Sequence, residues 1–206
     1  MEEIWNRNSL TGTEARQWRY TILEKILQRE ETQWKARMQH KPKLRTYTQL
    51  KTKLQFEHNY LTTKDREARE VMTRLRGGTN ELRIETGRYP ITNRDRPLEL
   101  KDRRCLICMN GEIEDEAHFM LDCCMYEDLR TKMLERYKST IKKHQPIEID
   151  VEKEKREKEG RGRLMAGLMG ERFAADTGLR AAVLWFCKRA MKRRNQLVRT
   201  VLDQRT

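Results

Sequence analysis

Apolar and aromatic residues are scarce in this chain. Of its 206 residues, 36% are hydrophobic, 7% are aromatic and 37% are charged. This composition argues against a large globular core and favours long amphipathic helices around a thin core. We therefore expect a mainly α fold. No apolar run approaches about eighteen residues, and the first residues lack the basic-then-apolar character of a signal peptide, so we expect no membrane partner.

The usual sequence motifs of enzymes are also missing. The chain contains no GxxxxGKS/T, GxGxxG, HExxH or GxSxG segment, each of which would indicate a particular catalytic or nucleotide site. His40, His58 and His144 stand alone, without the neighbours that a nucleophile needs. Acid pairs such as Asp115 and Glu116 can hold Mg²⁺ for phosphoryl chemistry, but in so charged a chain they are more often solvated or capping residues. We expect no catalytic activity and no small-molecule substrate.

Cysteines are few, and their number is odd. Four of the five lie between positions 105 and 124. A clustered, odd set fits a reducing compartment better than a disulfide framework. We therefore expect an intracellular protein of the nucleus, the cytoplasm or both.

The cysteine cluster has the spacing of a metal site. Cys105 and Cys108 are followed by His118 and Cys123 in the pattern C-x2-C-x9-H-x4-C, which predicts four ligands for a tetrahedral Zn²⁺. A disulfide, a redox dithiol and buried free thiols remain alternatives. A redox CxxC would end a strand and open a helix, whereas the flanking residues here indicate a turn between two short arms of a hairpin.

The geometry of the predicted site constrains the backbone around His118. Acidic residues from Glu114 onward, followed by apolar ones, predict a helix that carries His118. A residue five positions later on an ideal helix is rotated by about 140°. Cys123 can therefore share a metal with His118 only if the helix ends or distorts near residues 121–122, which leaves Cys124 as a substitute ligand. Glu114 is either an acceptor for the second imidazole N–H or simply an exposed acid. With four protein ligands, the predicted zinc site is structural.

Positive charge is segregated along the chain. The net charge is +13. Residues 41–104 contain 17 basic and 9 acidic residues, residues 105–140 contain 4 and 8, and residues 164–206 contain 9 and 3. Basic segments that flank an acidic one are typical of nucleic-acid-binding proteins. A generally basic protein, or one that meets an acidic partner, is the alternative.

Apolar periodicity and capping signals predict the remaining helices. Thr11 and Glu14 form a capping box before a helix over 12–40, and Gly77 and Gly78 are a stop signal. The densely charged stretch 144–162 has no apolar face and is expected to be a mobile linker, or at most a solvated helix. The other helices are expected at 43–54, 63–76, 80–87, 126–137 and 178–202. The expected units are an N-terminal helix (1–42), a helical zinc-binding domain (43–140), a charged linker (141–163) and a basic C-terminal helix (164–206).

Several motifs in the middle of the chain occur in an order typical of a known family. They are Lys43-Leu-Arg-Thr-Tyr47 with Lys51, Leu75-Arg-Gly-Gly78, Leu82-x-Ile-Glu-Thr-Gly-Arg-Tyr89, Cys105-x2-Cys108, Ile113-Glu-Asp-Glu-x-His118-Phe119 and Cys123. Together they resemble the carboxyl-terminal tail region of reverse transcriptases from non-LTR (LINE-type) retrotransposons, over about residues 43–137. The resemblance implies that Cys105, Cys108, His118 and Cys123 bind zinc. It also implies a role beside a polymerase that lies outside this chain, in gripping template RNA or target DNA during target-primed reverse transcription.

The expected function is therefore that of a zinc-stabilised accessory module that binds RNA, DNA or both. A reverse transcriptase or another protein is a further expected partner. The residues expected to contact the phosphate backbone are Lys43, Arg45, Lys51, Lys53, Arg74, Arg76, Arg83, Arg88, Arg103 and Arg104. The alternative is a protein-interaction module with a structural zinc, in which the helices at 12–40 and 178–202 dock onto a partner or onto a second copy.

Overall fold

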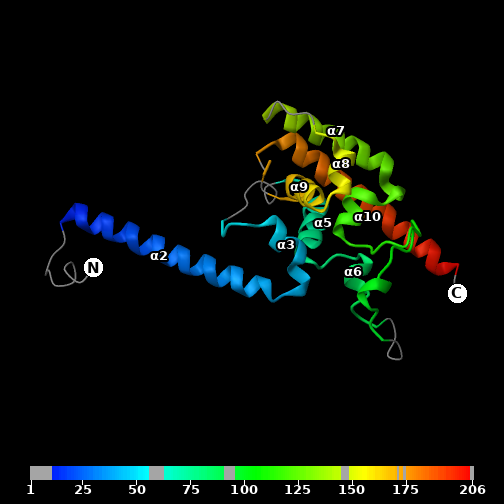
Figure 1. Ribbon diagram of the computed structural model, residues 1–206, viewed down its shortest axis with the longest axis horizontal. Helices are drawn as coiled ribbons and strands as arrows, with labels where there is room; N and C mark the ends of the chain where they lie inside the picture. The colour runs from blue at the N-terminus through cyan, green and yellow to red at the C-terminus, as the bar shows by residue number, and fades with distance from the viewer. Residues whose placement is uncertain are drawn as a thin grey trace.

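The computed structural model describes residues 11–55, 63–90, 96–144, 149–170, 172–173 and 175–204. Over these residues the fold is mainly helical, as predicted, and contains no strand (Figure 1). The α-helices are α2 (Gly12–Gln39), α3 (Arg45–Leu50), α5 (Arg66–Gly77), α6 (Arg83–Thr86), α7 (Glu127–His144), α8 (Val151–Arg156), α9 (Lys158–Met169) and α10 (Thr177–Asp203). The short 3-10 turns are η1 (Pro42–Leu44), η2 (Leu100–Asp102) and η4 (Cys124–Tyr126), and η3 (His118–Asp122) is a π-helical turn.

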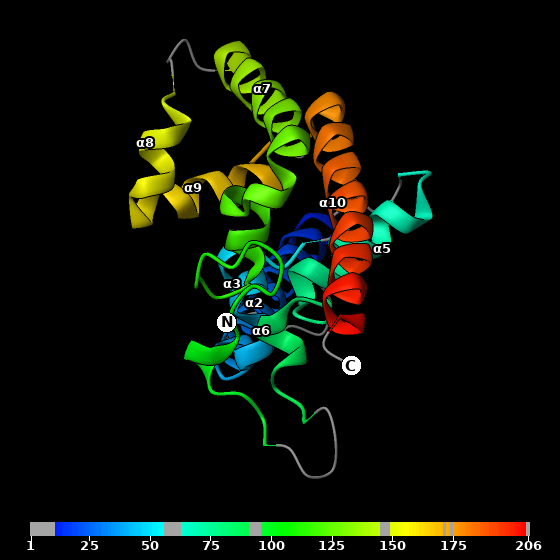
Figure 2. The ribbon, with the colours of Figure 1, turned by 90° about the vertical axis from the view of Figure 1, so that its right-hand side faces the viewer.

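Two long helices form one side of the body. α7 and α10 lie side by side (Figure 2) and run antiparallel, because Asp128 at the start of α7 pairs with Arg193 late in α10. Asp176, the N-cap of α10, pairs with Arg136 further along α7. α5 and α9 also pack against α10. These four helices, α5, α7, α9 and α10, pack around the segment that contains η3.

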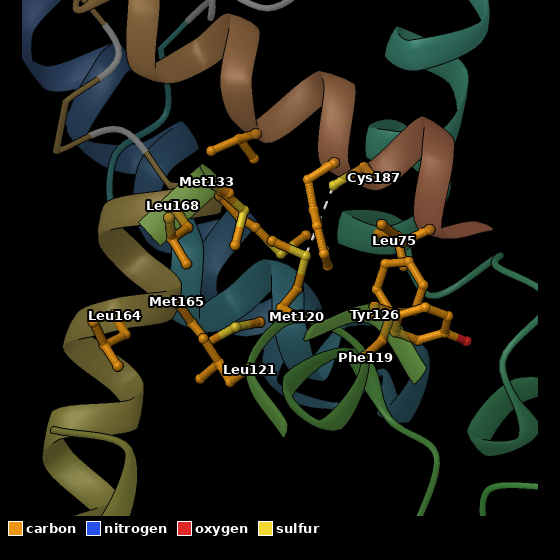
Figure 3. Packing of buried hydrophobic residues seen from close by; sticks show 14 of the residues in the cluster. Leu75, Phe119, Met120, Leu121, Tyr126, Met133, Leu164, Met165, Leu168 and Cys187 are labelled. Atoms are coloured by element: carbon orange, nitrogen blue, oxygen red, sulfur yellow. Dashed lines mark hydrogen bonds between the residues drawn. The ribbon is translucent and has the colours of Figure 1, made fainter. Parts of the chain in front are cut away.

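The core is small and rich in methionine. Figure 3 shows Met120 of η3 pointing between side chains of α7, α9 and α10. Phe119 packs against Tyr126 and Phe186, with ring centroids 5.2 Å and 5.7 Å apart. Flexible thioethers fill irregular gaps that branched side chains would leave. A chain with few large apolar residues therefore still packs a closed core around η3.

α2 leaves this body as a long arm (Figure 1). The Thr11 and Glu14 capping box is present, and the helix ends one residue earlier than predicted. Met38 is its one buried residue, and Trp34 meets Tyr47 edge to face at 6.5 Å. The arm is thus attached to the body at its C-terminal end.

Three predicted helices are shorter than their sequence patterns. The helix expected at 43–54 is η1 followed by α3, because Lys51 is extended and ends the helix. The helix expected from residue 63 begins after Asp65, whose carboxylate caps the Ala68 N–H. It ends at Gly77, and the next residue, Gly78, has φ 63° and lies against the Lys43 backbone. A side chain at Gly78 would clash there, so this glycine fixes η1 against α5. The helix expected at 80–87 is the single turn α6.

The segment 144–162, expected to be a mobile linker or at most a solvated helix, is largely helical and mostly exposed over the residues that the structure describes there, which exclude 145–148. Residues 151–156 and 158–169 are helical, and Val151 is only 2% exposed. The predicted boundary at 163 falls inside α9, whose Leu164 is 1% exposed in the core. Gly160 lets α9 approach the backbone of α8 closely. The high charge density of the sequence masked the apolar contacts of this pair of helices. Those contacts come from Val151, at the start of α8, and from Leu164, in the second half of α9.

Leu164→Ala should therefore destabilise the protein by about 2–5 kcal/mol, because it leaves a cavity beneath α9. Chemical denaturation monitored by circular dichroism measures the change. Leu202→Ala, at a helical position that is 47% exposed, is the control and should change stability by less than about 0.5 kcal/mol. Equal effects of the two substitutions would show that α9 does not pack as described.

Candidate functional site

Cys105, Cys108, His118 and Cys123 come together in the structure. Their ligand atoms all lie within 4.8 Å of one another, and Cys108 Sγ is 3.4 Å from His118 Nε2. Three of the four residues are buried and Cys108 is half-buried. These four donors can hold one metal ion.

An antiparallel bridge positions the first two cysteines. Arg104 pairs with Ile113, and the Cys105 N–H donates to the Glu112 carbonyl at 2.9 Å. Between them the chain turns through Met109 (φ 55°) and Gly111 (φ 78°). A single bridge therefore holds the two arms expected around the turn. Among the described residues, the pairing does not extend into a longer hairpin ladder.

The π-helical turn η3 aligns the other two ligands. The Cys123 N–H donates to the His118 carbonyl at 2.9 Å, an i→i+5 bond. Because a π turn holds more residues than an α turn, residues five apart come onto one side. The distortion that the spacing required near residues 121–122 is thus present, and it selects Cys123. Cys124 is exposed and lies outside the cluster.

The second imidazole nitrogen bonds a carboxylate that the sequence did not indicate. His118 Nδ1 lies 2.7 Å from Glu112 Oε2, so Nε2 faces the sulfurs. Glu114, the expected acceptor, is buried elsewhere. Its carboxylate accepts from Arg194 at 2.7 Å and 2.8 Å and from the Arg83 N–H at 2.7 Å. The expectation for Glu114 is therefore wrong, because a buried arginine engages both of its oxygens.

The thiols are electrostatically coupled. Hydrogen bonds from Cys123 and His118 hold the pKa of Cys105 far below that of a free thiol, and the same bond to Cys105 raises the pKa of Cys123. Burial lowers the pKa of His118, but its bonds to Cys105 and Glu112 raise it overall. The lowered pKa of Cys105 favours the thiolate, which is the form of cysteine that binds a metal. A buried charge is costly unless it is paired, and a bound cation would pair it.

A second set of potential ligands shares the histidine. Glu112, His118 and Asp122 also have ligand atoms close together. Asp122, however, forms a two-pronged ion pair with Arg161 of α9, at 2.7 Å and 3.0 Å. Glu112 bonds Nδ1 as described. Because both carboxylates are already engaged, the cysteine set is the better metal site.

Five of the ten basic residues expected to contact phosphate have internal roles. Arg45 forms ion pairs with Glu85 and Glu116, and Arg88 also pairs with Glu85, at 2.9 Å. The Arg103 guanidinium donates to the backbone carbonyls of residues 84 and 98. The two that are buried are Lys51, 5% exposed, and Arg76, 3% exposed. These five side chains hold the loops together and do not form an open surface for a ligand.

The other five lie on different elements. Lys43 packs on the Tyr89 ring, Arg74 pairs with Glu70 at 2.6 Å, and Arg83 is half-buried. The remaining two, Lys53 and Arg104, are exposed in loops. The structure therefore does not gather the ten residues into one row.

A basic and aromatic cluster that sequence reasoning missed lies across α7 and α10. Trp185 is 37% exposed, with Lys132 Nζ 5.7 Å and the Arg189 guanidinium 5.8 Å from its ring centroid. An open hollow of about 330 Å³ lies beside it, lined in part by Ala181 and Leu184. Trp185 does not fall at the helical spacing of the buried apolar residues of α10. This spacing was the sequence signal that could have indicated an exposed tryptophan.

No family model matches the chain, and searches of curated proteins and of solved structures find no similar protein. Within the described part of the chain, no helix has the length and apolar character needed to cross a membrane.

Cys108→Ser should abolish stoichiometric metal binding, because it removes one of four ligands. Cys124→Ser is the matched control, since this neighbouring thiol is exposed, and it should retain about one metal ion per chain. Elemental analysis of the purified variants measures the metal content. Retention of the metal in Cys108→Ser together with its loss in Cys124→Ser would reverse the ligand assignment.

Proposed function

We propose that this protein is a zinc-stabilised helical module that binds nucleic acid. The donor set supports zinc, because three sulfurs and one imidazole are its usual structural ligands. In a tetrahedron with Zn–S bonds of about 2.3 Å, ligand atoms lie about 3.8 Å apart, which the compact cluster accommodates. The acidic Glu112 on Nδ1 is the kind of outer partner that orients a metal-bound histidine. All four positions are protein ligands, so the metal is structural.

Buried arginines connect the metal centre to the two long helices. Arg130 of α7 is 0% exposed and donates to the carbonyls of Met120 and Cys123, at 3.0 Å and 2.6 Å. Arg194 of α10 holds Glu114 of the metal-binding loop. Because hydrogen bonds to charged groups are strong in a buried setting, ordering this loop also fixes α7 relative to α10.

The observation that carries nucleic-acid binding is the position of Trp185 between two cations. An exposed ring is a platform on which any base can stack, and adjacent basic side chains neutralise the phosphates. Lys132 and Arg189 are placed for this, and Lys192 is exposed one turn further along α10. α10 as a whole has seven basic residues and one acidic residue. A single strand of RNA or DNA stacked on Trp185 is the ligand that suits this surface.

The order of motifs quoted above supports a more specific setting for this activity. In the proposed setting the module acts beside a reverse transcriptase of the LINE type. The helices of the module, fixed by the zinc site, hold template RNA or target DNA. The phosphate contacts then come from α7 and α10 and from exposed residues such as Lys53, in place of the internally paired arginines.

Loss of the Trp185 surface should weaken binding in two separable ways. Trp185→Ala should cost about 1–3 kcal/mol in single-strand affinity through lost stacking. Combined replacement of Lys132, Arg189 and Lys192 by Gln should make the slope of log affinity against log salt less negative by about two to three. Fluorescence anisotropy with labelled RNA and DNA across a salt series measures both.

The matched control replaces Lys35, Lys101 and Lys158 by Gln, which removes the same charge from exposed sites elsewhere. It should leave the slope nearly unchanged. Equal losses from both triple variants would contradict the assignment of the surface, and an absence of salt-dependent binding by the zinc-loaded protein would contradict the function.

Glu112→Gln should lower zinc affinity about 10- to 100-fold, because the histidine loses its carboxylate partner while all four ligands remain. Competition with a chromophoric chelator measures the affinity. Glu135→Gln, an exposed position on α7, is the control. Unchanged zinc affinity in Glu112→Gln would show that this bond does not support the metal.

A further inference from the structure

The arm α2 exposes apolar side chains well beyond its attachment to the body. Its C-terminal end is covered, at Trp34 and Met38. Further toward its N-terminus the exposed side chains are Tyr20 (74%), Leu23 (56%), Ile26 (50%) and Leu27 (61%). Figure 1 shows this half of the helix standing away from the rest of the molecule. An isolated helix gains little from its own backbone bonds and normally buries such a face.

The exposed residues and two charges lie on one side of the helix. With about 100° per residue, Ile22, Leu23, Ile26 and Leu27 form one patch two turns long. Arg19 precedes this patch by one turn on its midline. Glu30 follows it by one turn on the same line. Each end of the patch is thus closed by a charge of opposite sign.

Because the basic and acidic residues lie at opposite ends of the patch, two α2 helices placed antiparallel would bring opposite charges together. If two α2 helices run antiparallel about a point midway between residues 24 and 25, Ile22 lies opposite the partner's Leu27. Leu23 then lies opposite the partner's Ile26. Arg19 meets the partner's Glu30, and the two-fold axis repeats that pair at the other end. In a parallel pair, by contrast, like charges would face each other at both ends, which is unfavourable.

We propose that α2 is a dimerisation arm that pairs antiparallel with α2 of a second copy of this chain. An isologous, two-fold interface needs one self-complementary surface, and residues 19–30 supply one. The charge pattern favours the second copy over an unrelated apolar partner, because a second copy supplies both complementary charges at the required spacing. The proposal does not depend on the metal centre or on nucleic-acid binding, since the contacts described here between α2 and the body, at Trp34 and Met38, lie near the C-terminal end of the helix.

Sedimentation equilibrium of the full zinc-loaded chain tests the proposal. The wild-type protein should be a dimer at micromolar concentration. Arg19→Glu alone and Glu30→Arg alone should each raise the dimer dissociation constant about tenfold or more, because each places like charges at both ends. The double variant Arg19→Glu/Glu30→Arg should restore the wild-type constant. Lys25→Glu, a charge reversal on the far side of the helix, should have little effect.

Zinc content and RNA affinity at one binding site should stay unchanged in these variants, which separates this test from that of the proposed function. A wild-type protein that remains monomeric at about 100 μM would overturn the proposal. So would single variants that dimerise as well as the wild type, or a double variant that fails to recover. Weakening by Leu23→Asp without any response to the charge variants would also overturn antiparallel self-pairing, because it would indicate a nonspecific apolar contact.

Discussion

One hydrogen bond of unusual span sets the geometry on which the rest of the structure depends. The bond from the Cys123 N–H to the His118 carbonyl closes a π-helical turn. On one side this turn presents the imidazole and the thiol to the two cysteines of the preceding loop. On its other sides it buries Phe119, Met120 and Leu121 in the core. Core packing and the geometry of the possible metal site therefore depend on the same turn, and a change to the turn would disturb both.

Arginines carry this local order outward. Arg130 and Arg194 connect the turn and the loop before it to α7 and α10, and Arg161 brings α9 to Asp122. Arg45 joins α3 to Glu116, two residues before the histidine. A guanidinium suits this role because its fork of donors can satisfy several carbonyl or carboxylate oxygens at once. In a chain with a thin apolar core, these buried polar contacts specify how the helices are placed.

This use of arginine explains which features the sequence could predict. Ligand spacing alone indicated the four residues that come together as a possible metal site, and it required the distortion that η3 provides, because coordination geometry leaves few solutions. The choice of Glu112 over Glu114 depended on Arg194, which is eighty positions away, and no local pattern reports such a pair. For the same reason Arg45 read as a phosphate contact. The burial of Val151 in α8 and of Leu164 in α9 was not predicted, because these apolar residues join the core from segments dominated by charge.

The thin core also separates two kinds of surface. The buried apolar residues of α5, α7, α9 and α10 enclose η3 in one core cluster. The apolar patch of α2 lies outside this cluster, on an arm that Trp34 and Met38 attach to the body at its C-terminal end. On the α7 and α10 side of the body, the exposed cations Lys132, Arg189 and Lys192 lie at or near Trp185. The arm and the basic cluster around Trp185 lie on different elements, so pairing of the arms would leave the cluster accessible. In the proposed dimer, two such clusters would then be available to one nucleic-acid chain.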